Sequence, residues 1–191
     1  VGINAAESLV LVSDRLNVSI EDLQELRFFA DLGGVGAEKF DSALEGLIKR
    51  VGELKRGSGE LKEALKGEND ALLNSLRVAT DARSAFLIAA DAISQEEDAT
   101  KRAALAAAFF GRSLGADLIN PLLEGRGAIE AAAREFRTFG GLTDENARAA
   151  EKTGDQFQKL ATVIKVNFQT AIIEAGPALE GFTDFLKDSI I

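Results

Sequence analysis

Histidine, cysteine, methionine, tryptophan and tyrosine are all absent from this chain of 191 residues. Without histidine and cysteine, the chain can build neither a Ser-His-Asp nor a Cys-His nucleophile system, no zinc site of the usual ligands and no disulfide. These absences exclude most classes of enzyme. We therefore expect no catalytic residues, no cofactor and no metal in this chain.

Positive charge and long apolar runs are also scarce. The 22 lysine and arginine residues are outnumbered by 31 aspartate and glutamate residues, which gives a net charge of -9. This acidic balance opposes attraction to nucleic acid phosphates and to anionic membranes, so we expect no specific nucleic acid partner. The longest run without a charge, residues 103–111, is far shorter than the roughly 20 apolar residues that a membrane-spanning helix needs.

What the sequence does contain is a helical spacing of apolar residues. Apolar side chains recur every three or four positions and the chain has only 2 prolines, which predicts an all-α fold of jointed helical hairpins. Most of the 18 glycines fall between these stretches, where a residue that tolerates positive φ ends a helix. Helices are expected at residues 20–31, 37–54, 60–66, 71–93 with a break near Thr80-Asp81, 99–110, 114–123, 128–139 and 143–175.

Two polar residues are predicted to begin helices. The Ser19 hydroxyl is expected to accept a hydrogen bond from the amide of Asp22, with Val18 and Leu23 packing around it as a hydrophobic staple. Asp98 is expected to cap the helix that follows it in the same way.

Two parts of the chain follow from this pattern. Residues 1–141 are predicted to form a multi-helix core segment, and residues 142–191 a long helix with a break at Gly176-Pro177. The chain begins at Val1 without methionine or a secretion signal and ends at Ile190-Ile191 within an apolar pattern. We expect it to be a segment of a longer protein.

Two apolar seams are the candidate functional residues, as surfaces for helix packing or for contact between copies. Each steps by four and three residues, as expected when one helix packs along another. The first seam consists of Phe40, Leu44, Leu47, Val51 and Leu54. The second consists of Phe157, Ala161, Ile164, Phe168, Ala171, Ala175, Leu179, Phe182 and Leu186. Because no later segment could cover the second seam, we expect it to lie in a parallel homo-oligomeric coiled coil.

Three local features of the sequence, two glycine stretches taken together, an acidic cluster and a basic cluster, have an alternative, functional interpretation. The glycine stretches 33–36 and 57–59 follow no strand and precede no Gly-Lys-Ser/Thr, so interhelical turns are favoured over phosphate loops. The carboxylates of residues 96–98 are assigned to a helix start rather than to acid/base or metal chemistry. The third cluster is basic and interleaved with glutamates, which favours a solvated helix face over a DNA contact. It consists of Lys49, Arg50, Lys55, Arg56, Lys62 and Lys66.

Two apolar features leave their role open. The pairs Phe28-Phe29 and Phe109-Phe110 either bridge two separate contacts or place both rings in a single core. The alanine run 103–108 either permits close approach of another helix or only supplies helix propensity.

Three stretches in order along the chain carry a resemblance to a known family. The first combines the capped helix start at 16–24 with the glycine turn and second helix start at 34–44. The second runs from Ile93 through Glu97-Asp98 to Leu105, and the third is Phe109-Phe110-Gly111-Arg112-Ser113 with the residues up to Leu123. Over about residues 16–141, the chain resembles the tail tape measure proteins of long-tailed bacteriophages and prophages, with Leu114 and Asn120 as single extra residues.

This resemblance implies a structural virion protein without enzymatic activity. Such a protein lies in the lumen of the tail tube, sets the tail length during assembly in the host cytoplasm and is released ahead of the DNA at ejection. Its implied partners are two further copies of itself, in a parallel homotrimer, and the proteins of the tail tube and tail tip. Because glycines interrupt its helices, we expect this segment to be a folded part near the tip rather than the straight rod.

Two other functional classes compete with this interpretation. A membrane-active, pore-forming protein is suggested by the amphipathic run from Phe157 to Leu186, although the acidic balance opposes avid binding to a membrane surface. In the tape measure interpretation, membrane contact is expected only on ejection. A carboxylate enzyme would need an aspartate or glutamate with a shifted pKa in a concave site, and no spacing indicates one.

Overall fold

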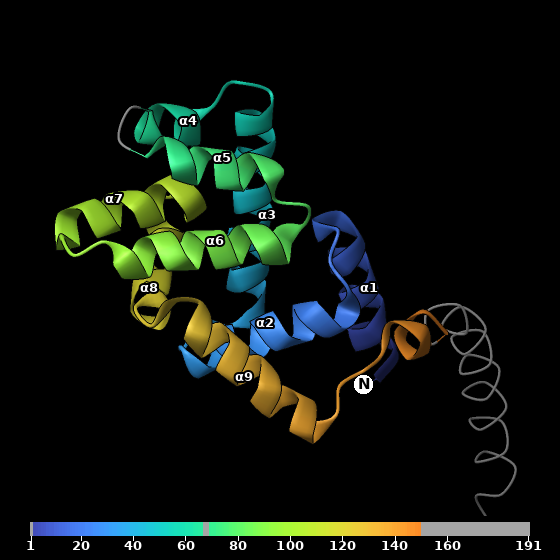
Figure 1. Ribbon diagram of the computed structural model, residues 1–191. Helices are drawn as coiled ribbons and strands as arrows, with labels where there is room; N and C mark the ends of the chain where they lie inside the picture. Colours follow the sequence, from blue (N-terminus) through green and yellow to red (C-terminus); the bar gives the residue numbers. More distant parts are fainter. Residues whose placement is uncertain (1, 67–68, 150–191) are drawn as a thin grey trace, which may run out of the picture. The chain divides into compact units, whose positions relative to one another are not determined.

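The computed structural model describes residues 2–66 and 69–149 of the chain (Figure 1). Over these residues all regular structure is helical and no strand occurs, which confirms the predicted all-α class. The helices are α1 (Gly2–Leu16), α2 (Ile20–Leu32), α3 (Ala37–Lys55), α4 (Glu60–Leu65), α5 (Asp70–Val78), α6 (Ala82–Gln95), α7 (Ala99–Phe110), α8 (Arg112–Leu122) and α9 (Gly125–Phe139).

Helix α3 runs through the middle of the compact unit Val1–Arg148 (Figure 1). It packs against α1, α2 and α4 to α8. Six of its apolar residues are buried and recur at helical spacing, so one stripe of α3 supplies the centre of the core. The remaining helices are arranged around this stripe, with α9 packed on α2 and α6.

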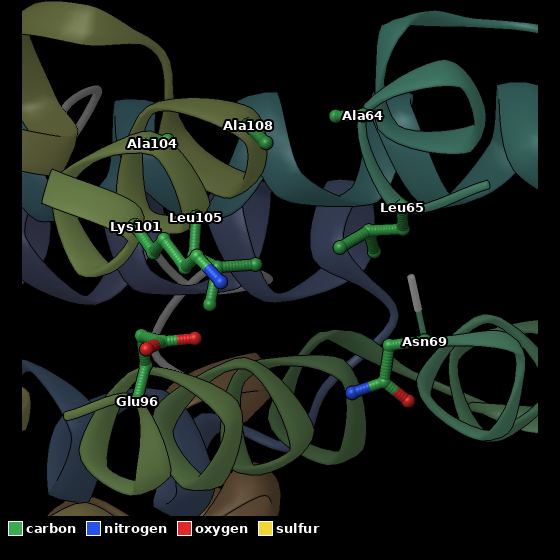
Figure 2. A pocket seen from close by; sticks show the side chains of 8 residues that line it. All are labelled: Ala64, Leu65, Asn69, Glu96, Lys101, Ala104, Leu105 and Ala108. Atoms are coloured by element: carbon green, nitrogen blue, oxygen red, sulfur yellow. The ribbon is translucent and has the colours of Figure 1, made fainter. Parts of the chain in front are cut away.

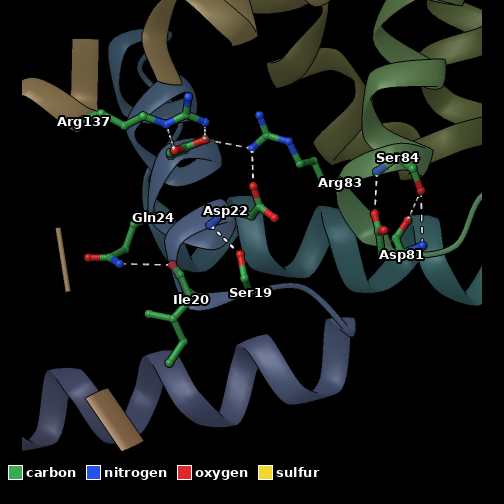
Figure 3. Close-up of polar contacts among 9 residues, drawn as sticks. Ser19, Ile20, Asp22, Gln24, Asp81, Arg83, Ser84 and Arg137 are labelled. Atoms are coloured by element: carbon green, nitrogen blue, oxygen red, sulfur yellow. Dashed lines mark hydrogen bonds and ion pairs between the residues drawn. The ribbon is translucent and has the colours of Figure 1, made fainter. Parts of the chain in front are cut away.

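Helix N-termini are set by the capping residues that the sequence predicts. The Ser19 hydroxyl accepts from the Asp22 amide at 3.0 Å (Figure 3), and Val18 and Leu23 both pack on the core. The Asp98 carboxylate accepts from two amides at the start of α7. Each cap satisfies amides that have no partner within the helix, which fixes where the helix begins.

Asp81 begins α6 with a capping box. Its carboxylate accepts from the Ser84 amide at 2.7 Å, and the Ser84 hydroxyl receives the Asp81 amide at 3.2 Å (Figure 3). The helical pattern at residues 71–93 is therefore divided into α5 and α6 at the predicted position.

Phenylalanine rings form the centre of the core. Phe86 of α6 contacts Phe40 of α3 edge-on, with the ring centroids 5.2 Å apart, and also packs against Phe29 and Phe110. Phe109 is buried as well, so both rings of the second pair enter one core.

Phe28 and Phe29 behave differently from that second pair. Phe29 is buried against Phe86, whereas Phe28 is half-buried and packs against Phe136 and Phe139 of α9. This pair therefore bridges two separate contacts, both of them within the chain.

Helices α7 and α8 approach each other closely within the alanine run 103–108. A Cβ atom on Gly115 of α8 would lie 2.5 Å from the carbonyl oxygen of Ala106, which is fully buried. Only glycine fits this contact, so α7 and α8 pack backbone to backbone at this point. The preceding turn needs Gly111, whose φ of 85° is in the left-handed region.

Some boundaries differ from those that the sequence predicts. The first predicted helix begins at residue 20, but residues 2–16 also form a helix, α1, which buries Leu9, Val10 and Leu16. Helix α9 begins at Gly125 rather than residue 128, because the Asp91 carboxylate of α6 receives the Arg126 amide and supplies a cap from elsewhere in the fold.

Candidate functional site

The five α3 residues of the first seam lie in the core of the compact unit. Phe40, Leu44, Leu47 and Leu54 are fully buried, and Val51 is 3% exposed. They pack on other helices of the same chain, so this seam presents no surface to a second copy in the described unit.

The residues of the second seam, 157–186, lie outside the described residues, as does most of the predicted long helix. Its start is visible: residues 144–149 are helical, and the Thr143 hydroxyl receives the Asn146 amide at 3.2 Å. No helix of the described residues combines the length and apolar character needed to cross a membrane.

The predicted polar clusters have structural roles where the structure describes them. The glycine stretches at 33–36 and 57–59 are turns between helices. Glu96 accepts from the Asp98 amide, next to the α7 cap, and the described residues contain no group of three or more carboxylates able to hold a metal ion. Of the basic cluster, Lys55 donates to the Ala79 carbonyl and Lys62 to the Gly57 carbonyl.

One cavity of about 400 Å³ lies beside α7 (Figure 2). Leu65 and Asn69 line one side of it, and Lys101 and Leu105 of α7 line another, with Glu96 across from them (Figure 2). Five of its eight lining residues are alanine or leucine, and the polar side chains of Asn69, Glu96 and Lys101 complete the lining. No ion pair joins Glu96 and Lys101 among the described residues, and this arrangement does not define a particular chemistry.

The most concentrated polar site is built around Glu25 of α2. Its side chain is 5% exposed, and it receives Arg137 of α9 on both oxygens, at 2.5 and 3.0 Å (Figure 3). Arg83 of α6 donates to the same carboxylate at 2.9 Å and to Asp22 at 2.8 Å. Hydrogen bonding to Glu25 raises the pKa of Arg137.

This arrangement joins three helices through one buried charge. A buried carboxylate is stable only when it is paired and hydrogen-bonded, and here two guanidinium groups meet that requirement. Three hydrogen bonds from these two guanidinium groups engage both Glu25 oxygens. The Glu25 site is therefore a structural clamp of α2, α6 and α9.

A second polar clamp holds the segment that follows α9. The Gln24 side chain donates to the Leu142 carbonyl at 2.8 Å and accepts from the Leu142 amide at 3.0 Å. Glu21 accepts from the Asp144 amide at 2.8 Å, and Asp14 of α1 accepts from Arg148 at 2.7 Å. We call these contacts the exit clamp; they extend the compact unit past residue 141.

Hydrogen bonds of the exit clamp shift the pKa values of Asp14 and Arg148. The hydrogen bond from Arg148 lowers the pKa of the Asp14 carboxyl, and the bonds to Asp14 and Asp144 raise the pKa of Arg148. The charged forms of both partners are therefore favoured where the chain leaves the unit.

An apolar groove of about 430 Å³ was not predicted from the sequence. It lies where α2 and α8 end and α9 begins, and it includes Leu32, Pro121, Leu123 and Ala131. Leu32 and Leu123 are 62% and 44% exposed, which is unusual for leucine in a well-packed unit. The helical pattern predicts both residues to be simple helix ends, and only the meeting of three helices turns them into a surface.

Comparison with protein families, curated proteins and solved structures finds no match to this chain.

Proposed function

We propose that this chain is a structural, all-helical part of a phage or prophage tail tape measure protein, without enzymatic activity. The observation that carries the proposal is the ordered set of motifs over residues 16–141. Support also comes from the positions of the motif residues in the fold. They are the residues that begin helices and allow the closest packing, rather than interchangeable surface positions.

Four motif positions illustrate this support. Ser19 and Asp98 cap α2 and α7. Gly115 lies against the α7 backbone, and the motif residue Pro121 packs so closely on Gly33 that a Cβ atom on Gly33 would lie 2.4 Å from it. Residues with such roles are expected where a family is defined by the way its helices are joined.

In this proposal, the compact unit is a folded body in the lumen of the tail tube, near the tip. Residues 149–191, which follow the exit clamp, associate with those of two other copies as a parallel homotrimer. The tail tube and tip proteins surround the assembly, which leaves the tube when the genome is ejected. Straight helical regions elsewhere in the full-length protein set the tail length, because a helix rises about 1.5 Å per residue.

Electron microscopy of assembled tails tests the proposal. The chain should be detected by mass spectrometry in purified tails. In-frame deletions in a straight helical region of the full-length protein should shorten the tails by about 1.5 Å per residue removed, and insertions of equal length should lengthen them equally. Tails of unchanged length in both variants, or tails that lack the chain, would contradict the proposal.

A further inference from the structure

The groove at the ends of α2 and α8 is one end of a longer apolar strip. Phe28 lies one helical turn before Leu32 on the same face of α2, and it packs against Phe136 and Phe139 of α9. Phe139 is 68% exposed. The strip therefore follows the junction of α2 and α9 from Leu123 to Phe139, a length of about 24 Å at 1.5 Å per residue.

The α9 residues that line the middle of this strip have short side chains. Ala131 is exposed and Ala128 is half-buried, so short side chains leave room for those of a partner. Glu124, Ala128, Ala131 and Glu135 follow one another in steps of four, three and four residues. Helical geometry therefore places the two glutamates on one face, about 16 Å apart.

The strip carries an unbalanced negative potential. Glu124 and Glu135 both line the groove, and neither makes an ion pair within residues 2–66 and 69–149. The C-terminal ends of α2 and α8 reach the same groove, and neither has a basic residue in its last turn. Their terminal carbonyls add partial negative charge that no basic side chain of those last turns offsets.

The opposing end of α9 does not cancel this potential. The α9 N-terminus carries partial positive charge, but its Arg126 amide is already bonded to Asp91 at 3.2 Å. The Arg126 guanidinium also pairs with Asp91, at 2.9 Å. Arg126 is thus neutralised by a carboxylate of α6.

We propose that this strip is the docking surface for a basic amphipathic helix of a partner protein. Apolar residues on one face of that helix enter the groove beside Leu32 and Leu123. Lysine or arginine residues near its two ends pair with Glu124 and Glu135, which requires a spacing of about eleven residues. Charge complementarity selects a cationic helix over the acidic segments of this chain, and the inference does not depend on the proposed function.

Two designed peptides test the docking surface on the full 191-residue chain. Both are labelled 15-residue helices with leucines in steps of three and four. One carries lysines eleven positions apart and the other carries glutamates at those positions. Fluorescence anisotropy at low salt should give at least tenfold tighter binding of the lysine peptide, and the difference should shrink in high salt as the charges are screened.

Substitutions of surface residues test whether the lysine peptide binds at the strip. Leu32→Ser should weaken binding of the lysine peptide by about tenfold through lost apolar contact, and the double variant Glu124→Lys/Glu135→Lys should favour the glutamate peptide. Val78→Ser is the matched control, because Val78 is also exposed, at 76%, but lies on α5. Circular dichroism checks that each variant is folded.

Three results would overturn the docking surface. The first is no binding of the lysine peptide at millimolar concentration, and the second is equal affinity for both peptides. The third is self-association of the chain that Leu32→Ser abolishes, because the occupant would then be a second copy. Failure of this test leaves the tail-length experiment unaffected.

Discussion

Gly115 of α8 and Ala106 of α7 are packed so closely that a Cβ atom on Gly115 would lie 2.5 Å from the Ala106 carbonyl oxygen. The obstacle is backbone, which cannot rotate away as a flexible side chain can. The contact fixes the α7 and α8 pair, which in turn places the groove at the end of α8.

Replacing this glycine should destabilise the unit. Gly115→Ala is expected to lower the free energy of unfolding by about 2 to 3 kcal/mol, because α7 and α8 must separate to admit the methyl group. Urea denaturation followed by circular dichroism measures the change. Gly127→Ala in α9 is the control: nothing lies within 4 Å of its Cβ position, so a neutral effect or a gain of up to about 1 kcal/mol is expected. Equal losses in the two variants would contradict the packing argument.

The Glu25 clamp should show strong coupling between its two arginines. Arg83→Met or Arg137→Met alone leaves the buried carboxylate with one partner, whereas the double variant leaves it with none. We expect the double variant to lose about 3 to 5 kcal/mol, more than the sum of the single losses. Thermal and urea unfolding of the four proteins measure the coupling.

A third substitution separates charge burial from general damage at the same site. Adding Glu25→Leu to the double variant removes the unpaired charge, so most of the lost stability should return. Single losses that add up to the double loss within about 0.5 kcal/mol would show that the arginines do not share the carboxylate.

Acid should weaken the helix caps. Hydrogen bonds from the Lys101 and Thr100 amides lower the pKa of Asp98 below its ordinary value of 3.8. A carboxyl with a lowered folded-state pKa contributes stability that is complete above the ordinary value and is lost as the pH falls through the folded-state pKa. The stability that Asp98 contributes is therefore expected to disappear below about pH 4.

The variant Asp98→Asn isolates this effect. Asparagine keeps a side-chain oxygen for the same two amides but does not titrate, so its unfolding free energy should fall less steeply with acid than that of the native chain. Asp81 behaves similarly, because burial raises its pKa but hydrogen bonds from Ser84 and Thr80 outweigh burial and lower it overall. Parallel curves of unfolding free energy against pH for the native chain and the variant would show that Asp98 does not cause the loss of stability in acid.

The exit clamp should control local opening at Leu142. Gln24→Ala removes both side-chain hydrogen bonds to the Leu142 backbone, so the Leu142 amide should exchange with solvent about tenfold faster or more. Gln24→Glu keeps the acceptor for that amide but loses the donor to the carbonyl, and an intermediate rate is expected. Hydrogen exchange followed by NMR gives the rates, with the Leu72 amide, capped by Asn69, as an internal reference. Unchanged exchange at Leu142 in both variants would contradict the clamp.

The helix starts could be predicted because capping is local. The Ser19 and Asp98 side chains contact amides two or three positions ahead, so the pattern is visible in a few residues. The α9 start is instead capped by Asp91, 35 positions away. This boundary depends on a distant partner, so the neighbouring sequence does not predict it.

The clamps and the groove could not be predicted for the same physical reason. Glu25 pairs with residues 58 and 112 positions away, so its role depends on how α6 and α9 are placed rather than on neighbouring sequence. The seam in α3 was visible as helical spacing, but spacing does not distinguish a core within one chain from an interface between copies. Leu32 and Leu123 form a surface only where three helix ends meet.

The exit clamp also determines where tension would enter the molecule. A pull on the chain beyond Arg148 is borne first by Asp14, Glu21 and Gln24, the side chains of α1 and α2 that hold residues 142–148. Helix α9 carries no load until those bonds break. The strip between α2 and α9 therefore keeps its shape while residues 142–148 bear such a pull, so mechanical strain and the proposed docking fall on different parts of the same compact unit.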